Sequence, residues 1–314
     1  MTFERILAEI SQYCPKLENF SFPIDTSDLE TVQSVLFAVA VSWAELWCRW
    51  GISPAAVIGQ SQGELAAAYF SRHIGLESAA QLIACRARLL SSLSSENTAV
   101  LAAGCGASDV LRFGGESGVV LNLVAVNSAY STTVSGSRTD ILKVMSLMEN
   151  EGIVVDLIDS LRIAPHSPDI SQLEAGFRAE LPVSFPEPAS PTTCPWFSSV
   201  TASRVEAGTG VRSSAYWYQN LRCTVRLGDA LSACISEVSP DVLMESTPFP
   251  ILGKPMSEVI RGCGRSSDIP IVSRRVPAGW SNFDSMLKQA ARLYISGFDV
   301  MWNTVSKDLL PIRQ

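Results

Sequence analysis

The chain has 314 residues, enough for one large α/β domain or two smaller ones, and 47% of them are hydrophobic, so a sizeable core can form. Charged residues make up 18% of the chain, which excludes an intrinsically disordered protein. The net charge of −7, without a block of like charges, argues against nucleic acid as a partner, because phosphate binding needs a concentrated basic face.

The first part of the chain alternates apolar helices with a strand. Ser27-Asp28-Leu29-Glu30 has the spacing of a capping box and opens a long apolar helix that Gly51 is expected to end. Glu45 interrupts this helix and Arg49 closes it, so we expect it to be buried in the protein rather than in a membrane. A short strand, AAVIG, and two further helices follow. This alternation indicates a mainly parallel α/β sheet.

The pattern changes near residue 97. Residues 97–166 predict the order strand, helix, strand, strand, helix, strand, which is that of a ferredoxin-like unit. We expect this small unit to be inserted into the larger α/β domain, which then comprises residues 1–96 and 167–272. Residues 182–196 are a proline-rich extended connection, and residues 273–314 form a tail with one amphipathic helix.

A short motif, GQSQGE, places Ser61 between two glycines, after the apolar strand and before a helix. GxSxG in this context is the pattern of a nucleophile elbow, in which glycines allow a sharp turn and the N–H after the serine can serve an oxyanion. A glycine-rich strand-to-helix turn with an idle serine would have the same pattern. Ser61 is therefore a candidate nucleophile.

A serine nucleophile needs a base, and the chain has two histidines. His73 lies on the helix that follows Ser61, about 18 Å away at 1.5 Å per residue, which is out of reach. His166, in RIAPHSPDI at the end of the small unit, remains as the candidate base. No acidic residue stands out to orient it, so a backbone carbonyl could accept from its other ring nitrogen.

Taken together, these motifs resemble a known family. GQSQGE, Arg86, VAVNSAYSTTVSG, IAPHSPD, WFSSVTASRV, YWYQNLRCTVRL and MESTPFPIL occur in this order. As a set they resemble the acyltransferase domain of modular polyketide synthases, related to malonyl-CoA:acyl-carrier-protein transacylase. The tail from SRRVPAGW to LLPIRQ resembles the linker that follows that domain. The resemblance implies an α/β hydrolase-like large subdomain with the ferredoxin-like insert.

The resemblance also implies a mechanism. Ser61 would attack an acyl-CoA thioester with His166 as general base, and the phosphopantetheine thiol of an acyl carrier protein would then take the acyl group. The backbone N–H of Gln62 would donate to the oxyanion. The carbonyl that orients His166 would be that of Arg226. No bound cofactor is implied; acyl-CoA and the carrier protein are substrates and partners, and neighbouring synthase domains are further possible partners.

Further positions match residues that line the family's pocket. An arginine at the position of Arg86 pairs in this family with the free carboxylate of a malonyl-type acyl group; a solvated helix arginine is the alternative. The other matching positions are Gln33, Gln60, Asn127, Ile163 and Pro165.

The four residues that end in the family's catalytic histidine track its substrate. Malonyl-selective members tend to have HAFH and methylmalonyl-selective members YASH, whereas this chain has Ile163-Ala164-Pro165-His166. Pro165 is nearer to serine in bulk than to phenylalanine, and Ile163 makes the wall apolar. Gln62 also favours the methylmalonyl type. The sequence therefore predicts an extender with a substituent at C2.

The chain departs from the family's pattern at three places. Gln60 stands where histidine is usual, and Phe249 replaces the histidine of SPHP. The family also opens with a strand and a GQGxQ loop that supplies a second oxyanion donor, and the first residues here, FERILAEI, match a point beyond them. We expect this opening segment to be absent from the 314 residues.

Location and partners follow from charge and cysteine usage. The eight cysteines are scattered without a CxxC pair, and two histidines offer little to a zinc ion, so we expect no metal site and reduced thiols. No signal peptide is recognisable, and a cytoplasmic location is expected. Carrier proteins of this type are usually acidic, and Arg204, Arg212 and Arg222 are candidates for a basic docking patch.

The sequence thus predicts a self-acylating acyltransferase that works in polyketide biosynthesis. The closest alternative is an acyl hydrolase of the same fold, against which Arg86 argues, because hydrolases of this family favour acyl groups without the carboxylate. A non-catalytic docking or scaffold domain is the alternative from another class.

Overall fold

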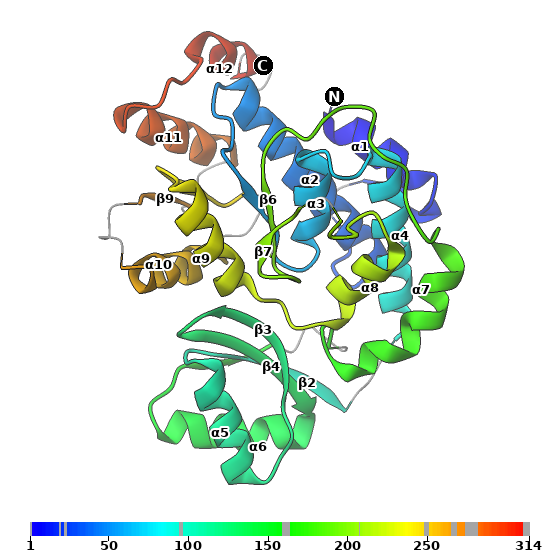
Figure 1. Ribbon diagram of the computed structural model, residues 1–314, viewed down its shortest axis with the longest axis vertical. Helices are drawn as coiled ribbons and strands as arrows, with labels where there is room; N and C mark the ends of the chain where they lie inside the picture. Colours follow the sequence, from blue (N-terminus) through cyan, green and yellow to red (C-terminus); the bar gives the residue numbers. More distant parts are fainter. Residues whose placement is uncertain are drawn as a thin grey trace.

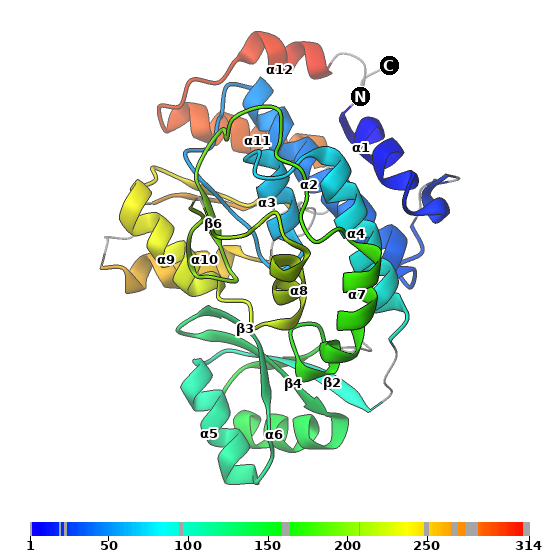
Figure 2. The same cartoon turned by 45° about the vertical axis from the view of Figure 1, so that its right-hand side comes forward.

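A computed structural model describes the fold for residues 2–18, 20–21, 24–93, 97–158, 164–206, 208–247, 251–264, 269–273 and 282–309. Figures 1 and 2 show a larger body, in which helices surround short strands, and a smaller unit at one end. Both ends of the chain lie on the larger body, at the side away from the small unit (Figure 2).

The strands of the larger body pair mainly in parallel, but they are short and fall into two sheets. β1 (Val57–Ile58) pairs in parallel with β6 (Trp196–Ser198), and β7 (Ser203–Arg204) runs antiparallel to β6. β8 (Leu243–Met244) and β9 (Ile271–Val272) form a separate parallel pair. The predicted α/β class with mainly parallel pairing is confirmed. Among the described strands, however, the larger body has two separate sheets, one that contains β1 and one that contains β8.

Helices pack around these strands (Figures 1 and 2). Those of the larger body are α1 (Thr2–Ser11), α2 (Leu29–Arg49), α3 (Gly63–Phe70), α4 (Leu76–Ser91), α7 (Glu174–Glu180), α8 (Ser214–Arg222), α9 (Leu227–Val238), α10 (Gly253–Gly262), α11 (Asn282–Ile295) and α12 (Trp302–Leu309), with 3-10 turns at Pro15–Leu17 and Pro168–Leu173. The main core packs α1, α2, α3, α4, α7 and α8 around Trp196 of β6.

The long apolar helix α2 is a packed helix of this body. By length and composition it is the one helix in the described parts of the chain that could cross a membrane, yet it packs against α1, α3 and α4 and buries Phe37, Ala38 and Val41. Its C-terminal stop is as predicted, because Gly51 follows the cap residue with φ of +94°, a conformation that favours glycine. The predicted capping box is wrong: Asp28 is the N-cap, and Ser27 instead donates to Asp25.

The small unit has the predicted order of elements. These are β2 (Thr98–Ala103), α5 (Ala107–Ser117), β3 (Asn122–Ser128), β4 (Ser131–Ser137), α6 (Arg138–Asn150) and β5 (Val155–Leu157). The sheet is antiparallel in the order β3-β4-β2-β5, which is the ferredoxin-like arrangement. α5 and α6 cover the face away from the larger body (Figure 1), while β3 faces α9 and α10.

The tail packs closely on the larger body. α11 and α12 enclose an apolar cluster with Trp47, Trp50 and Ile52 at the end of α2. Asp308 accepts hydrogen bonds from Arg49 at 2.6 Å and from the Trp50 indole at 3.1 Å. The predicted amphipathic helix corresponds to α11, and its apolar face is part of a core shared with α2.

Candidate active site

The turn from β1 into α3 has the geometry of a nucleophile elbow. Ser61 lies between the two elements with φ of +53°, in the left-handed region that side chains rarely adopt. Gly59 permits the turn, because a Cβ there would lie 2.2 Å from the backbone nitrogen of Glu64. The turn therefore projects Ser61 ahead of α3, and the strain in its backbone is the kind found at functional sites.

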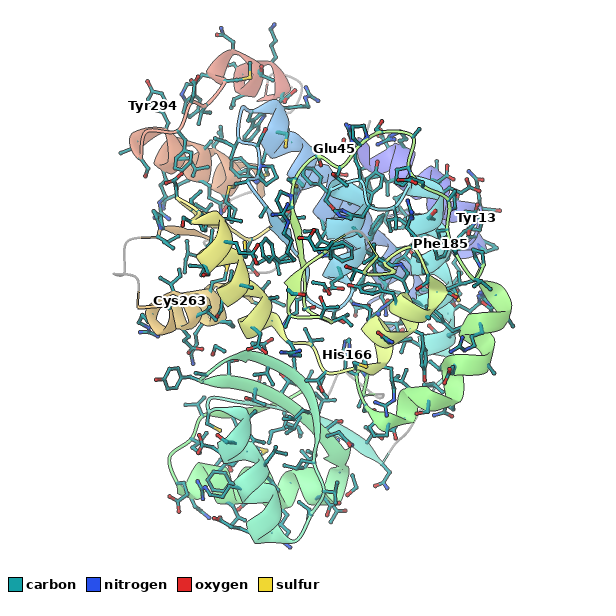
Figure 3. The ribbon with its side chains drawn as sticks, in the orientation of Figure 1. Tyr13, Glu45, His166, Phe185, Cys263 and Tyr294 are labelled. Atoms are coloured by element: carbon teal, nitrogen blue, oxygen red, sulfur yellow. The ribbon has the colours of Figure 1, made fainter. Side chains whose placement is uncertain are left out.

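His166 lies beside Ser61, as the elimination of His73 predicted. Its Nε2 is 2.6 Å from Ser61 Oγ, and its Nδ1 is 3.0 Å from the carbonyl oxygen of Cys223. A proton on Nδ1 can be donated to that carbonyl, which leaves the lone pair of Nε2 facing the serine hydroxyl. Figure 3 shows His166 at the boundary between the larger body and the sheet of the small unit.

The carbonyl that orients His166 is not that of Arg226, so this prediction is wrong. Arg226 is the N-cap of α9, and its carbonyl accepts from the backbone N–H of Ala230 in the first turn of that helix. Cys223, three residues earlier, ends α8 in an extended conformation and points its carbonyl at the imidazole.

Arg86 extends from α4 into the same site and is 5% exposed. Its Nη2 donates to Ser61 Oγ at 3.0 Å, and its Nη1 donates to the side-chain oxygen of Asn220 at 3.0 Å. The alternative of a solvated helix arginine therefore fails. Its Nε is buried without a partner in the described part of the chain.

Asn220 and Glu64, two polar residues that the sequence analysis missed, lie next to Ser61 and Arg86 and connect them to the surrounding helices. Asn220 on α8 donates to the carbonyl of Ser61 at 3.2 Å and to Glu64 at 3.3 Å. Glu64, in the first turn of α3, is fully buried and also accepts from the Tyr216 hydroxyl at 2.8 Å and from Ser199. The signal that could have revealed Glu64 is a charged residue on the apolar face of a short, alanine-rich helix.

Burial sets the protonation states of these groups. Desolvation, helped by the positive charge of Arg86, lowers the pKa of His166 to about 3, so its imidazole is a neutral base at neutral pH. Desolvation also lowers the pKa of Arg86 to about 10, although the negative charge of Glu64 acts to raise it. The guanidinium of Arg86 therefore still carries its charge at neutral pH. The pKa of Glu64 is raised by its burial, while its hydrogen bonds oppose that shift.

His166 should therefore stay unprotonated well below the pKa of an ordinary histidine. Between pH 6.5 and about 3 the unfolded chain carries a proton on this imidazole that the folded protein lacks. The stability contributed by the neutral form is complete above pH 6.5 and is lost as the pH falls toward about 3. An NMR titration should find His166 neutral at about pH 5. Protonation near pH 6.5 would contradict this buried geometry.

The other predicted pocket residues that the structure describes lie near the turn at Ser61. The Gln60 amide donates to the Asn127 side-chain oxygen at 2.7 Å, which links the elbow to β3. The Gln62 side chain donates to the backbone carbonyl of Gln33, whose buried side-chain oxygen has no partner in the described structure. Gln62 is the N-cap of α3, where backbone N–H groups lack partners within the helix. Pro165 adjoins His166 and is half-buried, whereas Ile163 and Phe249 lie outside the described residues.

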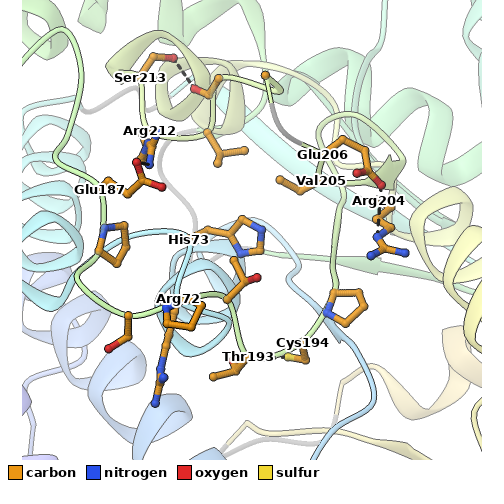
Figure 4. Close-up of a pocket in the computed structure, with 18 of the residues that line it drawn as sticks. Arg72, His73, Glu187, Thr193, Cys194, Arg204, Val205, Glu206, Arg212 and Ser213 are labelled. Carbon is orange, nitrogen blue, oxygen red and sulfur yellow. Dashed lines mark hydrogen bonds and ion pairs between the residues drawn. The ribbon is translucent and has the colours of Figure 1, made fainter.

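A pocket of about 880 Å³ lies in the larger body, beside His73 and the proline-rich connection. None of Ser61, Arg86 and His166 lines it. Figure 4 shows His73 and three arginines, Arg72, Arg204 and Arg212, around it. Arg204 pairs with Glu206 at 3.2 Å and Arg212 with Glu187 at 3.1 Å, so neighbouring carboxylates offset both charges. Arg222 donates to Ser171 at 3.3 Å. The two ion pairs argue against a basic docking patch at Arg204 and Arg212, whereas the neutral hydroxyl of Ser171 does not offset the charge of Arg222, which stays a predicted docking residue.

The site contains no grouping suited to a metal ion. Within the described ranges, no three His, Cys, Asp or Glu side chains gather closely enough to bind one. The chemistry that the described residues can perform is that of an activated serine beside a neutral imidazole, with a buried cation 3.0 Å from the nucleophile.

Comparison with known proteins gives a consistent result. Residues 22–300 match the sequence profile of the acyl transferase domain family. The chain is 34% identical over 285 residues to erythronolide synthase EryA2 of Saccharopolyspora erythraea, covering 90% of this chain and 8% of that protein. It is 32% identical over 275 residues to mycoketide-CoA synthase of Mycobacterium tuberculosis, covering 87% and 6%. The chain thus spans less than a tenth of the length of these two relatives.

Solved structures share the fold. The acyltransferase domain from module 8 of the salinomycin polyketide synthase superposes with a TM-score of 0.82 at 28% identity, covering 96% of this chain and 71% of the other. A loading acyltransferase from the avermectin modular polyketide synthase superposes with a TM-score of 0.79 at 25% identity, covering 93% and 92%.

Proposed function

The chain belongs to the acyl transferase domain family found in modular polyketide synthases, and we propose that it transfers a malonyl-type acyl group from coenzyme A to the phosphopantetheine thiol of an acyl carrier protein. The observation that carries this proposal is Arg86, a buried cation whose Nη2 lies 3.0 Å from the nucleophile Ser61. A guanidinium in that position can pair with the carboxylate of an acyl group attached to the serine.

In the first half of the proposed reaction, Nε2 of His166 takes the hydroxyl proton as Ser61 Oγ attacks the thioester carbonyl. The developing oxyanion accepts a hydrogen bond from the backbone N–H of Gln62, a type of contact worth about 10²–10³ in rate. The tetrahedral intermediate collapses to acyl-Ser61, and the sulfur of coenzyme A leaves with the proton from His166. The Cys223 carbonyl stabilises the imidazolium that forms in between.

The second half repeats these steps with a different nucleophile. Nε2 of His166 takes the proton of the phosphopantetheine thiol, whose sulfur attacks the acyl-Ser61 carbonyl. Collapse of the intermediate breaks the bond to Ser61 Oγ, which regains its proton from His166. The neutral state of His166 in the buried site supports its role as base in both halves.

We further propose that the acyl group carries a substituent at C2. Pro165 is small beside His166, and its fixed φ holds the pocket wall in place. Each methylene buried in an apolar pocket adds about 0.8 kcal/mol of binding, and one methylene discriminates by about 10–200-fold.

This substrate class can be tested by competition. Malonyl-, methylmalonyl- and ethylmalonyl-CoA, mixed in equal amounts with the chain, should give mainly the methylmalonyl or ethylmalonyl adduct of Ser61 by intact mass. Pro165→Phe is the matched variant, because it should fill the space and shift the preference to malonyl-CoA. A wild-type preference for malonyl-CoA would rule out the open pocket.

We also propose domain limits and a cytoplasmic location for the protein. The acyltransferase core would comprise residues 1–96 and 167–272, the small subdomain residues 97–166, and the linker residues 273–314. All eight cysteines are free thiols, which supports a reducing, cytoplasmic location.

A further inference from the structure

The connection between α8 and α9 crosses between the larger body and the small unit. We call its residues, Cys223–Arg226, the strap. Figure 1 shows it running beside β3 of the small unit. The larger body holds both of its ends, because the N–H of Cys223 donates to Gln219 at 2.8 Å and the N–H of Arg226 donates to Ser199 at 2.8 Å.

The middle of the strap is bonded to β3 instead. The Thr224 hydroxyl donates to the carbonyl of Leu123 at 2.8 Å. The N–H of Val225 donates to the carbonyl of Val124 at 3.0 Å, and its carbonyl accepts from Val126 at 2.8 Å. Val225 is buried against Ala125, with which it forms a parallel bridge. The strap is therefore bonded, through one parallel bridge, to the edge strand of the small unit's sheet.

These bonds act on the carbonyl that orients the catalytic base. The carbonyl of Cys223 and the N–H of Thr224 belong to one rigid, planar peptide group. Any tilt of Thr224 on β3 therefore turns the oxygen that lies 3.0 Å from His166 Nδ1.

β3 is also linked to Ser61, the other member of the pair, through the neighbouring residue Gln60. Asn127, near the end of β3, accepts from Gln60, which precedes Ser61. α9 is packed tightly on this part of the strand, since a Cβ on Gly228 would lie 3.1 Å from the carbonyl oxygen of Asn127. One strand of the small unit thus contacts Ser61 through Gln60 and His166 through the strap.

We propose that the strap transmits the placement of β3 to His166, with Thr224 and Val225 as positioning residues that set the reactivity of Ser61. Neither residue reaches the reacting atoms. The proposal rests on the proposed function only in taking Ser61 and His166 as nucleophile and base, and it does not depend on which acyl group is carried.

The test compares Thr224→Val, Thr224→Ser and Thr193→Val in the full chain. Valine at position 224 keeps the shape and removes the hydroxyl bond to β3, whereas serine keeps the hydroxyl. Thr193 is the matched control, because its hydroxyl donates to the backbone carbonyl of Phe70 at 3.0 Å in the larger body and it belongs to neither the strap nor β3. The reactivity of Ser61 is read from its labelling by an alkyl fluorophosphonate, which needs no acyl-CoA.

We expect Thr224→Val to slow labelling about tenfold, the effect of one hydrogen bond, with Thr224→Ser and Thr193→Val near the wild-type rate. With two histidines in the chain, imidazole NMR gives a second readout: the His166 Nδ1–H resonance should move in Thr224→Val while that of His73 stays. An unchanged labelling rate in Thr224→Val, or equal slowing in Thr193→Val, would overturn the strap's role.

Failure of the proposed function would look different. A wild-type chain that is labelled by the fluorophosphonate but forms no adduct with any acyl-CoA would contradict acyl transfer and leave the strap proposal intact. A wild-type Ser61 that the fluorophosphonate does not label would refute both, because the nucleophile and base would not act together.

Discussion

Replacing Ser61 with alanine should abolish the acyl adduct, and replacing His166 with alanine should slow its formation by about 10⁴-fold or more. Among the described residues, the base that contacts Ser61 Oγ is His166, whose Nε2 lies 2.6 Å away, while His73 is bonded to Ser71 instead. Rapid-quench intact mass after mixing with methylmalonyl-CoA measures both rates.

His73→Ala is the matched control for this experiment. It removes the other histidine, whose ring packs edge-on against Trp196, and should leave acylation near the wild-type rate at a temperature where the fold is retained. A normal acylation rate in His166→Ala would mean that another group takes the serine proton, and the assignment of the base would fall.

Replacing Arg86 with alanine should reverse the preference between dicarboxylic and monocarboxylic acyl groups. Without the guanidinium, the free carboxylate of a malonyl-type group is buried and unpaired, a penalty of about 2–5 kcal/mol that propionyl does not incur. Because Arg86 also donates to Ser61 Oγ, the variant can slow acylation in general, so the ratio of kcat/KM for methylmalonyl-CoA to that for propionyl-CoA is the informative quantity.

Arg88→Ala provides the comparison. Arg88 lies on the same helix, but it is exposed and paired with Glu180, so its removal should leave the ratio unchanged. A ratio that stays in favour of methylmalonyl-CoA in Arg86→Ala would eliminate the carboxylate contact, and with it the main argument for a dicarboxylic substrate.

The proximity of Ser61 and His166 could be predicted because the sequence signals of these two residues are local or few. The turn at Ser61 depends on a glycine that no other residue can replace, and two histidines left one choice. The ferredoxin-like order was likewise readable from hydrophobic periodicity and turns.

What the sequence did not predict depends on tertiary contacts. A backbone carbonyl has no side-chain signature, so the choice of Cys223 over Arg226 follows only from where α8 ends and α9 begins. The buried pair of Glu64 and Asn220 spans 156 residues, and each residue alone reads as an ordinary polar side chain. The prediction for the start of α2 failed for a local reason instead, because the Ser27 hydroxyl donates to Asp25, two residues earlier.

The most direct test of the central claim follows an acyl group from Ser61 to a carrier. The chain is loaded with methylmalonyl-CoA, freed of excess donor and mixed with a phosphopantetheinylated acyl carrier protein in a single turnover read by intact mass. We predict that the Ser61 adduct decays faster as carrier is added, with an equal gain of acylated carrier. Decay at one rate with and without carrier, with the acyl group released to water, would identify a hydrolase, and no adduct at all would identify a non-catalytic domain; either result would contradict acyl transfer.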